Sequence, residues 1–318
     1  MVRNLKEINR VSSNLDGRAS DFVSVIIPTY NRARVLHRAM RSVLAQTHRN
    51  LELIIADDAS TDDTEEMVRS FGDDRVVYLR QDRNRGASAA RNLGLAHARG
   101  ALIAFQDSDD EWLLDNLERQ IEALRSAGPG YGATFGMKLI YGHDEAHVYG
   151  EGRTCVAPDR DRPVIPGELT TQLLYGNLIS PQTLLLTAEA ARKVGKFDER
   201  LPCNNDWEYM LRLSRVTKIG HTPAPVVVAY ISSDSIHTRL RSKARSFLVI
   251  LGKHANLFER EPKAYAGKLF TVGRYLYKLG RYRAATRCMI RAIQVAPIAP
   301  KPWIGLFQTQ LCRVVPRA

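Results

Sequence analysis

Short apolar runs alternate with amphipathic segments along the first third of the chain. Four of these runs have the length and composition of buried strands: residues 22–27, 51–56, 76–79 and 101–105. After the first run, apolar side chains recur at helical spacing: Leu36, Met40, Val43 and Leu44. Strands that alternate with helices are typical of parallel sheets, so the pattern predicts an α/β fold with a mostly parallel central sheet.

Polar and acidic residues follow three of the four predicted strands. They are Pro28, Thr29 and Tyr30 after the first strand, Asp57 and Asp58 after the second, and Asp107, Ser108 and Asp109 after the fourth. The carboxyl ends of parallel strands meet at one edge of a sheet, where such folds bind their ligands. We therefore expect one crevice there, and a nucleotide is the ligand that it favours.

The stretch from Asp107 to Glu111 holds four acids in five residues. Carboxylates this close repel one another unless a cation neutralises them, and hard oxygen ligands suit Mg²⁺ or Mn²⁺, which in turn would hold a phosphate. The alternative is that Asp110 and Glu111 are the acidic start of a helix that begins near Trp112. The residues alone leave both interpretations open.

Charge divides the 318-residue chain, whose net charge is +12. Residues 236–318 hold 17 Lys and Arg against 2 Asp and Glu, a balance of +15, and residues 1–235 hold 29 against 32, a balance of −3. We therefore predict three parts: a polar leader (1–20), a catalytic domain (21–235) and a basic helical region (236–318). The basic region favours an anionic partner, such as phospholipid or an anionic glycan.

The basic region has its own helical pattern. Residues 265–279 and 282–295 are separated by Gly280 and predict a helical hairpin, which the prolines at 297, 300 and 302 prevent from continuing. The last segment, from Trp303 onward, combines aromatic and basic side chains and is suited to a membrane interface. The alternative is a helical pair that packs on the body of the protein with its basic face in water.

Targeting signals are missing from the sequence. The first ten residues have no apolar signal core, and no run approaches the roughly 18 apolar residues that a spanning helix needs. Cys155, Cys203, Cys288 and Cys312 have neither paired nor metal-ligand spacing, which is typical of reduced thiols. We therefore expect a cytoplasmic protein, held peripherally at the inner face of the membrane by its basic region.

Five ordered motifs closely resemble those of the non-processive, bacterial-type family 2 glycosyltransferases. They are Val-Ser-Val-Ile-Ile-Pro-Thr-Tyr-Asn-Arg, Ile-Ala-Asp-Asp-Ala-Ser-Thr-Asp, Asn-Arg-Gly-Ala-Ser-Ala-Ala-Arg-Asn, Asp-Ser-Asp-Asp-Glu-Trp and the acidic motif at Asp206. The resemblance covers about residues 22–235. It implies the glycosyltransferase A fold, which is Rossmann-like, a nucleotide-diphosphate sugar donor of the UDP or dTDP type, a Mn²⁺ or Mg²⁺ ion, and inversion at the anomeric carbon.

The resemblance also implies roles for individual residues. Pro28, Thr29 and Tyr30 would line the base and ribose, and Asp58 would accept a hydrogen bond from one of them, with Asp57 nearby. Arg85 and Arg91 would help to hold the donor, although each could instead form a surface salt bridge. Asp107, Ser108 and Asp109 match the Asp-x-Asp motif of the family, in which Asp109 would be the direct metal ligand beside Asp107.

Asp206 matches the second acidic motif of the family and would be the general base. A hydroxyl is a poor nucleophile near neutral pH, so a carboxylate must accept its proton during attack. The alternative is an N-cap of the following helix. Two neighbours depart from the family pattern: Asn205 stands where Glu is usual, and Glu208 where Asp is common. A separate residue, His237, is only a weak candidate for contact with the diphosphate or metal.

Together these features predict transfer of one sugar to a glycan or lipid-linked acceptor in cell-surface polysaccharide biosynthesis. The Gln-x-x-Arg-Trp motif of processive synthases is absent. A sugar-nucleotide-forming nucleotidyltransferase would need a glycine-rich loop after the first strand, and that loop is absent too. A non-catalytic basic module at a membrane surface is the other alternative, whereas the acidic crevice argues against nucleic acid as a partner.

Overall fold

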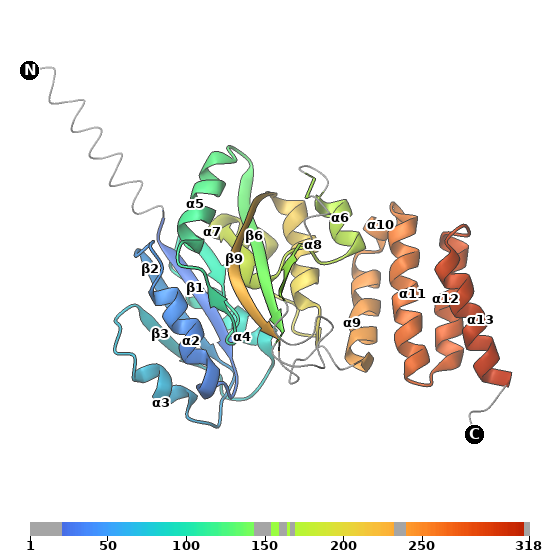
Figure 1. Cartoon of the computed structure of the whole chain (residues 1–318), viewed down its shortest axis with the longest axis horizontal. Coiled ribbons are helices and arrows are strands. Elements are labelled where there is room, and N and C mark those ends of the chain that lie inside the picture. The colour runs from blue at the N-terminus through green and yellow to red at the C-terminus, as the bar shows by residue number, and fades with distance from the viewer. Residues whose placement is uncertain (1–20, 143–153, 159–163, 166–168, 232–239, 315–318) are drawn as a thin grey trace, which may run out of the picture. The chain divides into compact units, whose positions relative to one another are not determined.

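The computed structural model describes residues 21–142, 154–158, 164–165, 169–231 and 240–314 (Figure 1). The chain divides into two compact units. The first, which we call the sheet unit, consists of Met1–Pro166, Ile179–Phe197 and Arg212–Ser233. The second, the helical unit, consists of Gly167–Leu178, Asp198–Leu211 and Asp234–Ala318. The domain boundary that the sequence predicts at residue 235 stays a prediction.

The sheet unit is built on one curled sheet. Its strands are β1 (Val23–Thr29), β2 (Leu51–Asp57), β3 (Val76–Arg80), β4 (Leu102–Phe105), β5 (Glu111–Trp112), β6 (Tyr131–Gly142), β7 (Thr154–Ala157), β8 (Leu184–Thr187) and β9 (Lys218–Ile231). Their order is β3-β2-β1-β4-β8-β6-β9-β5, and β7 pairs with β6. The first four strands are parallel to one another, as the sequence predicts. β8 runs antiparallel to both β4 and β6.

Both faces of the parallel strands are buried, which is why β1 and β2 have apolar runs rather than alternation. Val25 and Leu53 lie in one core cluster with Leu36 of α2 (Ala33–Leu44) and Leu117 of α5 (Asn116–Ser126). The opposite face of β1 packs against α4 (Ala87–His97). A Cβ at Gly94 of that helix would lie 2.4 Å from Ile26, so only glycine allows this approach.

The alternative interpretation of Asp110 and Glu111, as the start of a helix near Trp112, does not match the structure. Glu111 and Trp112 form β5, which pairs antiparallel with Val228 and Val227 of β9, and the helix begins only at Asn116. The buried Trp112 indole donates from Nε1 to the Gln182 carbonyl at 2.9 Å. Partners more than 60 residues away thus override the local preference of these acids for a helix start.

The remaining helices flank this core or form the helical unit. They are α3 (Thr64–Arg69), α6 (Leu169–Tyr175), η1 (Pro181–Thr183), α7 (Ala188–Val194), α8 (Asn205–Val216), α9 (Leu240–Lys253), α10 (Ala255–Glu259), α11 (Pro262–Lys278), α12 (Tyr282–Val295) and α13 (Pro300–Val314). The hairpin of α11 and α12 confirms the predicted pair. Pro300 and Pro302 lie in the first turn of α13, where proline is tolerated. Among the described residues no helix is long and apolar enough to cross a membrane.

Two kinds of contact hold the helical unit together. The Trp207 ring packs against the rings of Phe247 and Phe258, with centroids 5.3 and 6.3 Å apart. At the other end, the Met289 side chain of α12 lies where a Cβ at Gly273 of α11 or at Gly305 of α13 would stand, at 2.7 and 2.8 Å. These glycines therefore let three helices pack closely.

Candidate active site

Hydrogen bonds join the loops at the carboxyl ends of β1 and β2. Asn31 N donates to Ser60 Oγ at 2.8 Å, and Thr61 N donates to Asn31 Oδ1 at 2.7 Å. Asn31 and Ala59 have positive φ angles of 52° and 64°, and the hydrogen bonds of the two loops stabilise this backbone conformation. The loops therefore form one linked rim at this edge of the sheet.

The residues predicted to meet the nucleoside end β1. Pro28 and Thr29 are buried strand residues, and the next side chain, Tyr30, is 44% exposed. The Thr29 hydroxyl is buried and has no hydrogen-bond partner within the described part of the chain. An unpaired hydroxyl beside an exposed ring can offer a hydrogen bond and a stacking surface to a ligand.

Asp57 is wholly buried and its carboxylate is already bonded. Oδ1 accepts from Ser60 N at 2.9 Å and from Ser60 Oγ at 2.6 Å, and Oδ2 accepts from the Tyr78 hydroxyl. Burial and the Asp57 carboxylate together raise the pKa of Tyr78. These bonds tie β2 to β3 and to the following turn, so Asp57 shapes the rim.

Asp58 is also buried, and it holds the loop that leads into α4. Oδ1 accepts from Arg85 N at 2.7 Å and from Gln81 Nε2 at 3.0 Å, and Oδ2 accepts from Gly86 N at 2.6 Å. Burial raises the pKa of Asp58, and the two amides oppose that shift. A carboxylate has about four acceptor sites, so one remains for the base or ribose. The exposed Arg85 is positioned by the same loop.

Arg91 and Asp107 form a partly buried ion pair. Arg91 lies in α4, and its Nη2 donates to Asp107 Oδ1 at 2.9 Å. The guanidinium also lies over the Phe197 ring, 5.6 Å from its centroid. The salt bridge considered for Arg91 thus exists but is partly buried, and it orients the first carboxylate of the Asp-Ser-Asp sequence.

Among the described residues, Asp109 is held less tightly than the three carboxylates described above, and its cation contact with Arg32 is a long one. Its side chain is 37% exposed and lies 3.9 Å from Arg32 Nη2, while Arg38 donates to its main-chain oxygen at 2.8 Å. Partial burial and the charge of Asp107 raise the pKa of Asp109. Ser108, between the two, is half-buried. A proton or a cation would relieve the excess negative charge here.

The carboxylate oxygens of this turn suit a divalent ion whose other coordination positions are filled by the substrate. Among the described residues, no group of three or more His, Cys, Asp or Glu side chains is arranged to hold a metal. Mg²⁺ commonly takes one or two protein carboxylates and fills its other positions with water and substrate phosphates. Asp109 and Asp107 can supply such carboxylates.

Asp110 is a site residue whose role the sequence did not indicate. It is buried, its Oδ1 accepts from Tyr230 N at 3.1 Å, and its Oδ2 accepts from Gln182 Nε2 at 2.9 Å. Burial, followed by the charges of Asp107 and Asp109, raises its pKa well above the usual range. The helix-start interpretation of Asp110 is therefore wrong, and the residue anchors the acidic turn to β9 and η1. Its partners lie 72 and 120 residues further along the chain, so no local pattern could reveal it.

In the helical unit, Asp206 occupies the first turn of α8 and is half-buried. Its Oδ2 accepts a hydrogen bond from Asn177 Nδ2 at 2.8 Å. The next residue, Trp207, is fixed because its Nε1 donates to the Leu173 carbonyl at 2.7 Å. The carboxylate is thus held by the segment that follows α6.

Glu208, which departs from the family pattern, has a structural role. It is fully buried and pairs with Lys253 Nζ at 2.8 Å and with His254 Nε2 at 3.2 Å. Lys253 also contacts Asp198 at 3.0 Å. Glu208 therefore anchors the start of α8 to α9. His237, the weak candidate for diphosphate or metal contact, lies outside the described residues.

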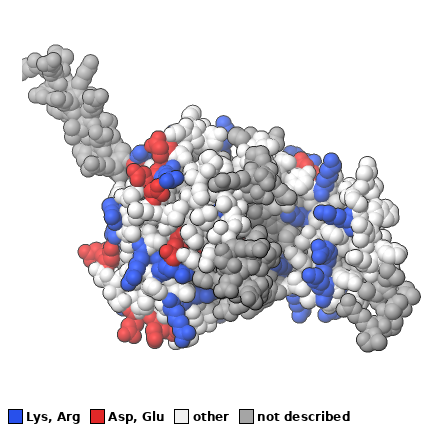
Figure 2. Space-filling model, viewed as in Figure 1, with Lys and Arg blue, Asp and Glu red and all other residues white. Residues whose placement is uncertain are grey.

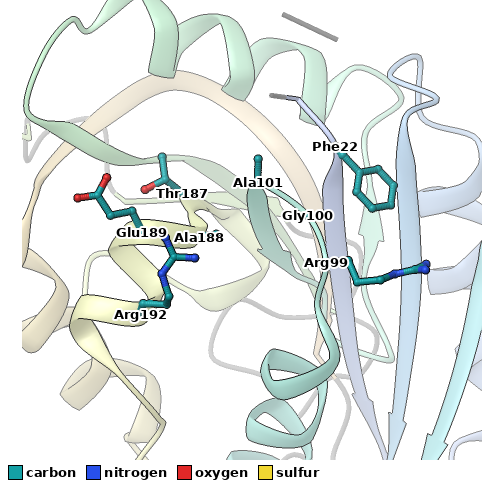
Figure 3. Close-up of a pocket in the computed structure, with 8 residues that line it drawn as sticks. All are labelled: Phe22, Arg99, Gly100, Ala101, Thr187, Ala188, Glu189 and Arg192. Carbon is teal, nitrogen blue, oxygen red and sulfur yellow. The ribbon is translucent and has the colours of Figure 1, made fainter. Parts of the chain in front are cut away.

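A surface pocket occurs at the opposite edge of the sheet, where β1 and β4 begin (Figure 3). Its lining residues are Phe22, Arg99, Gly100, Ala101, Thr187, Ala188, Glu189 and Arg192. The Arg99 guanidinium is already paired with Glu52 at 2.7 Å. None of the predicted site residues lines this pocket, so it is separate from the candidate active site.

Comparison with known sequences agrees with this geometry. The profile described as Glycosyl transferase family 2 matches residues 24–154. The glucosyltransferase WfaP of Escherichia coli, named as acting between UDP-Glc and α-D-GlcNAc-diphosphoundecaprenol, is 39% identical over 106 residues, which are 33% of this chain and 42% of that protein. An uncharacterized glycosyltransferase of Rickettsia prowazekii is 30% identical over 200 residues, 63% of this chain and 61% of the relative. The chain thus spans less than two thirds of each of these relatives.

Solved structures share the fold. The mannosyltransferase PcManGT of Pyrobaculum calidifontis, solved with GDP-Man and Mn²⁺, superposes with a TM-score of 0.59 at 19% identity, covering 92% of this chain and 80% of that one. Residues 1–349 of S. aureus TarS with UDP-GlcNAc give 0.55 at 17% identity, covering 92% and 91%. These likenesses confirm the glycosyltransferase A fold. Residues 24–154 are therefore similar to glycosyl transferase family 2, and the fold is the one that these glycosyltransferases share.

Proposed function

We propose that this protein transfers a single sugar, with inversion, from a nucleotide-diphosphate sugar to a hydroxyl of a glycan or lipid-linked acceptor in cell-surface polysaccharide biosynthesis. The observation that carries the proposal is the Asp109 carboxylate at the ligand-binding edge of the sheet, which is partly exposed and has only a 3.9 Å contact with Arg32 among the described residues. The names of the relatives, which include UDP-Glc and a diphosphoundecaprenol acceptor, support this reaction class.

The donor would bind along the rim formed by the loops after β1, β2 and β4. Tyr30 stacks against the base, and the unpaired Thr29 hydroxyl and the last acceptor site of Asp58 take hydrogen bonds from the nucleoside. Pro28 and Asp57 keep this rim in shape, and Arg85 contacts the donor. We propose a UDP or dTDP donor, although the solved PcManGT complex holds GDP-Man.

Asp109, with Asp107, would hold a Mn²⁺ or Mg²⁺ ion, and Ser108 lies between them beside the donor. The ion, when bound, neutralises negative charge that develops on the departing diphosphate. The protein contributes by fixing the turn beforehand. Arg91 donates to Asp107, and Tyr230 N and Gln182 Nε2 donate to Asp110 in the same turn. A site fixed in advance needs little reorganisation as charge develops.

Asp206 would act as the general base. The Asn177 amide donates to Oδ2 and fixes the orientation of the carboxylate, so Oδ1 accepts the proton of the attacking acceptor hydroxyl. The acceptor oxygen attacks the anomeric carbon as the bond to the nucleoside diphosphate breaks. Attack from the side opposite the leaving group inverts the anomeric configuration.

The test is a thermal-shift screen of UDP-, dTDP- and GDP-sugars with and without Mn²⁺, followed by a transfer assay with the donor that binds. A ligand that binds the folded state raises the melting temperature. We expect a Mn²⁺-dependent shift with one nucleotide and a product of inverted configuration by NMR. No shift with any nucleotide sugar, or a product of retained configuration, would contradict the proposal.

We also propose that the protein works at the cytoplasmic face of an anionic membrane, where a lipid-linked acceptor would lie. The support is the charge of +15 over residues 236–318.

A further inference from the structure

Apolar side chains gather on the solvent side of α13 and on the turn before it. Ile298 is 96% exposed, Trp303 51%, Ile304 58% and Phe307 67%. They make up four of the twelve exposed large hydrophobic residues in the described part of the chain, yet they lie within ten consecutive positions. Single exposed apolar residues are ordinary, whereas a cluster marks an interaction surface.

Packing within the helical unit does not explain this cluster. The inner side of α13 consists of Pro302, Gly305 and Thr309, which are buried at helical spacing. A Cβ at Gly305 would lie 2.8 Å from Met289 and 3.0 Å from Phe270, so this side already contacts α11 and α12. The helix thus has one apolar side in the core and a second one in solvent.

The charges around this surface are all of one sign. From Pro262 to Ala318 the sequence contains 11 Lys and Arg and no Asp or Glu. Three of the arginines, Arg283, Arg287 and Arg291, are exposed at spacings of four along α12. On the side of the helical unit that Figure 2 shows, blue side chains lie along α11, and the surface over α12 and α13 is largely white.

We propose that Ile298, Trp303, Ile304 and Phe307 form a membrane-insertion surface that binds an anionic phospholipid bilayer. Aromatic and aliphatic side chains enter the boundary between head groups and acyl chains, while Lys and Arg side chains attract anionic head groups. The Trp303 indole already donates from Nε1 to the Pro297 carbonyl at 2.9 Å, so its orientation is set before it meets lipid.

The charges favour lipid over the other occupants of such a surface. Two copies of this chain would bring together two acid-free cationic segments, which repel each other. Single-stranded nucleic acid is also anionic, but its bases bind by stacking on aromatic rings. Two of the four residues here are isoleucines, which offer no such ring, so this surface suits lipid better. The inference rests on the proposed function in one respect: membrane binding would give the enzyme access to a lipid-linked acceptor.

Trp303 provides a direct probe. The chain has three tryptophans, and the other two, Trp112 and Trp207, are 4% and 2% exposed. We expect vesicles containing phosphatidylglycerol to shift the tryptophan emission of the full chain to shorter wavelength, and vesicles of phosphatidylcholine alone to have little effect. Trp303→Phe should remove the shift while the protein still sediments with the anionic vesicles.

Cosedimentation with the same vesicles tests the surface itself. The double variant Ile304→Ser/Phe307→Ser should bind phosphatidylglycerol vesicles at least tenfold more weakly than the wild type. Leu248→Ser is the matched control, because Leu248 is 47% exposed on α9 of the same unit, and it should bind within twofold of the wild type. Thermal shift by the nucleotide sugar with Mn²⁺ should be equal in all three proteins, which separates this inference from the proposed function.

Three results would overturn the inference. One is equal vesicle binding by the wild type and the double variant. Another is a dimer, detected by light scattering without lipid, that the double variant abolishes, since the surface would then join two copies. The third is binding to a single-stranded oligonucleotide that the double variant weakens, without any binding to anionic vesicles.

Discussion

The loops after β2 and after β4 both begin with acidic residues at the end of a buried strand, but they use their carboxylates differently. Asp57 and Asp58 are buried and hydrogen-bonded to backbone amides and hydroxyls of their own rim. Asp109 is partly exposed and has only a distant arginine. Similar sequence signatures therefore have different outcomes: one loop is held together by its acids, and the other leaves an acid partly exposed, where we propose that it meets the donor's cation.

The largest effect that this comparison predicts is loss of transfer in Asp109→Asn. If this carboxylate holds the cation as proposed, removing its charge should lower the rate on the order of 1000-fold, the upper range for removal of one preorganised electrostatic group. The melting temperature should stay the same or rise, because repulsion from Asp107 disappears. Initial rates with the donor found by the screen, together with thermal unfolding, check both expectations. A rate near that of the wild type would remove Asp109 from the site.

Asp58→Ala should act mainly on stability. It leaves the amides of Arg85 and Gly86 and the side chain of Gln81 without their acceptor, so we expect the free energy of unfolding to fall by about 3 kcal/mol. Urea unfolding measures this quantity. Asp109→Ala is the matched control and should change it by less than about 0.5 kcal/mol. Equal losses in the two variants would erase the distinction between the loops.

Asp198, in the helical unit, is another buried and paired carboxylate, and its contribution to stability should depend on pH. The hydrogen bond from Arg200 holds the pKa of Asp198 well below its usual range, against the effect of burial, and Lys253 adds to this. An unfolded Asp titrates near pH 3.9, so this stabilisation is fully present above about pH 4 and is lost as the pH falls further, through the folded pKa. Asp198→Asn should therefore be less stable than the wild type at pH 7, with a smaller loss than Asp58→Ala because Arg200 is mostly exposed. The difference should shrink at pH 3, and a difference that grows there would contradict the assignment.

The smallest effect concerns Tyr30. If its exposed ring stacks on the base, Tyr30→Ala should weaken donor binding about threefold, as expected for one aromatic contact, and Tyr30→Phe should leave it unchanged. Calorimetric titration with the nucleotide distinguishes the two variants. Equal affinity in all three proteins would place the base elsewhere.

The sequence predicted the parallel half of the fold well because β1 to β4 are local apolar runs separated by amphipathic helices. It left open whether a helix starts near Trp112, and pairing with β9, far along the chain, excludes that alternative. It predicted the strand ends that carry acids, but it did not predict that Asp110 would be buried against Gln182 and Tyr230. Asp206 was identified through a family motif alone, and its contact with Asn177 depends on tertiary structure.

The central claim is that the partly exposed Asp109 carboxylate, which has only a long contact with Arg32, binds the donor's cation. Electron paramagnetic resonance of Mn²⁺ in the presence of the matching nucleoside diphosphate tests it most directly. We expect bound Mn²⁺ in the wild type and in Tyr30→Ala at saturating nucleotide, and loss of the bound signal in Asp109→Asn. Undiminished Mn²⁺ binding by a folded Asp109→Asn protein would contradict the claim.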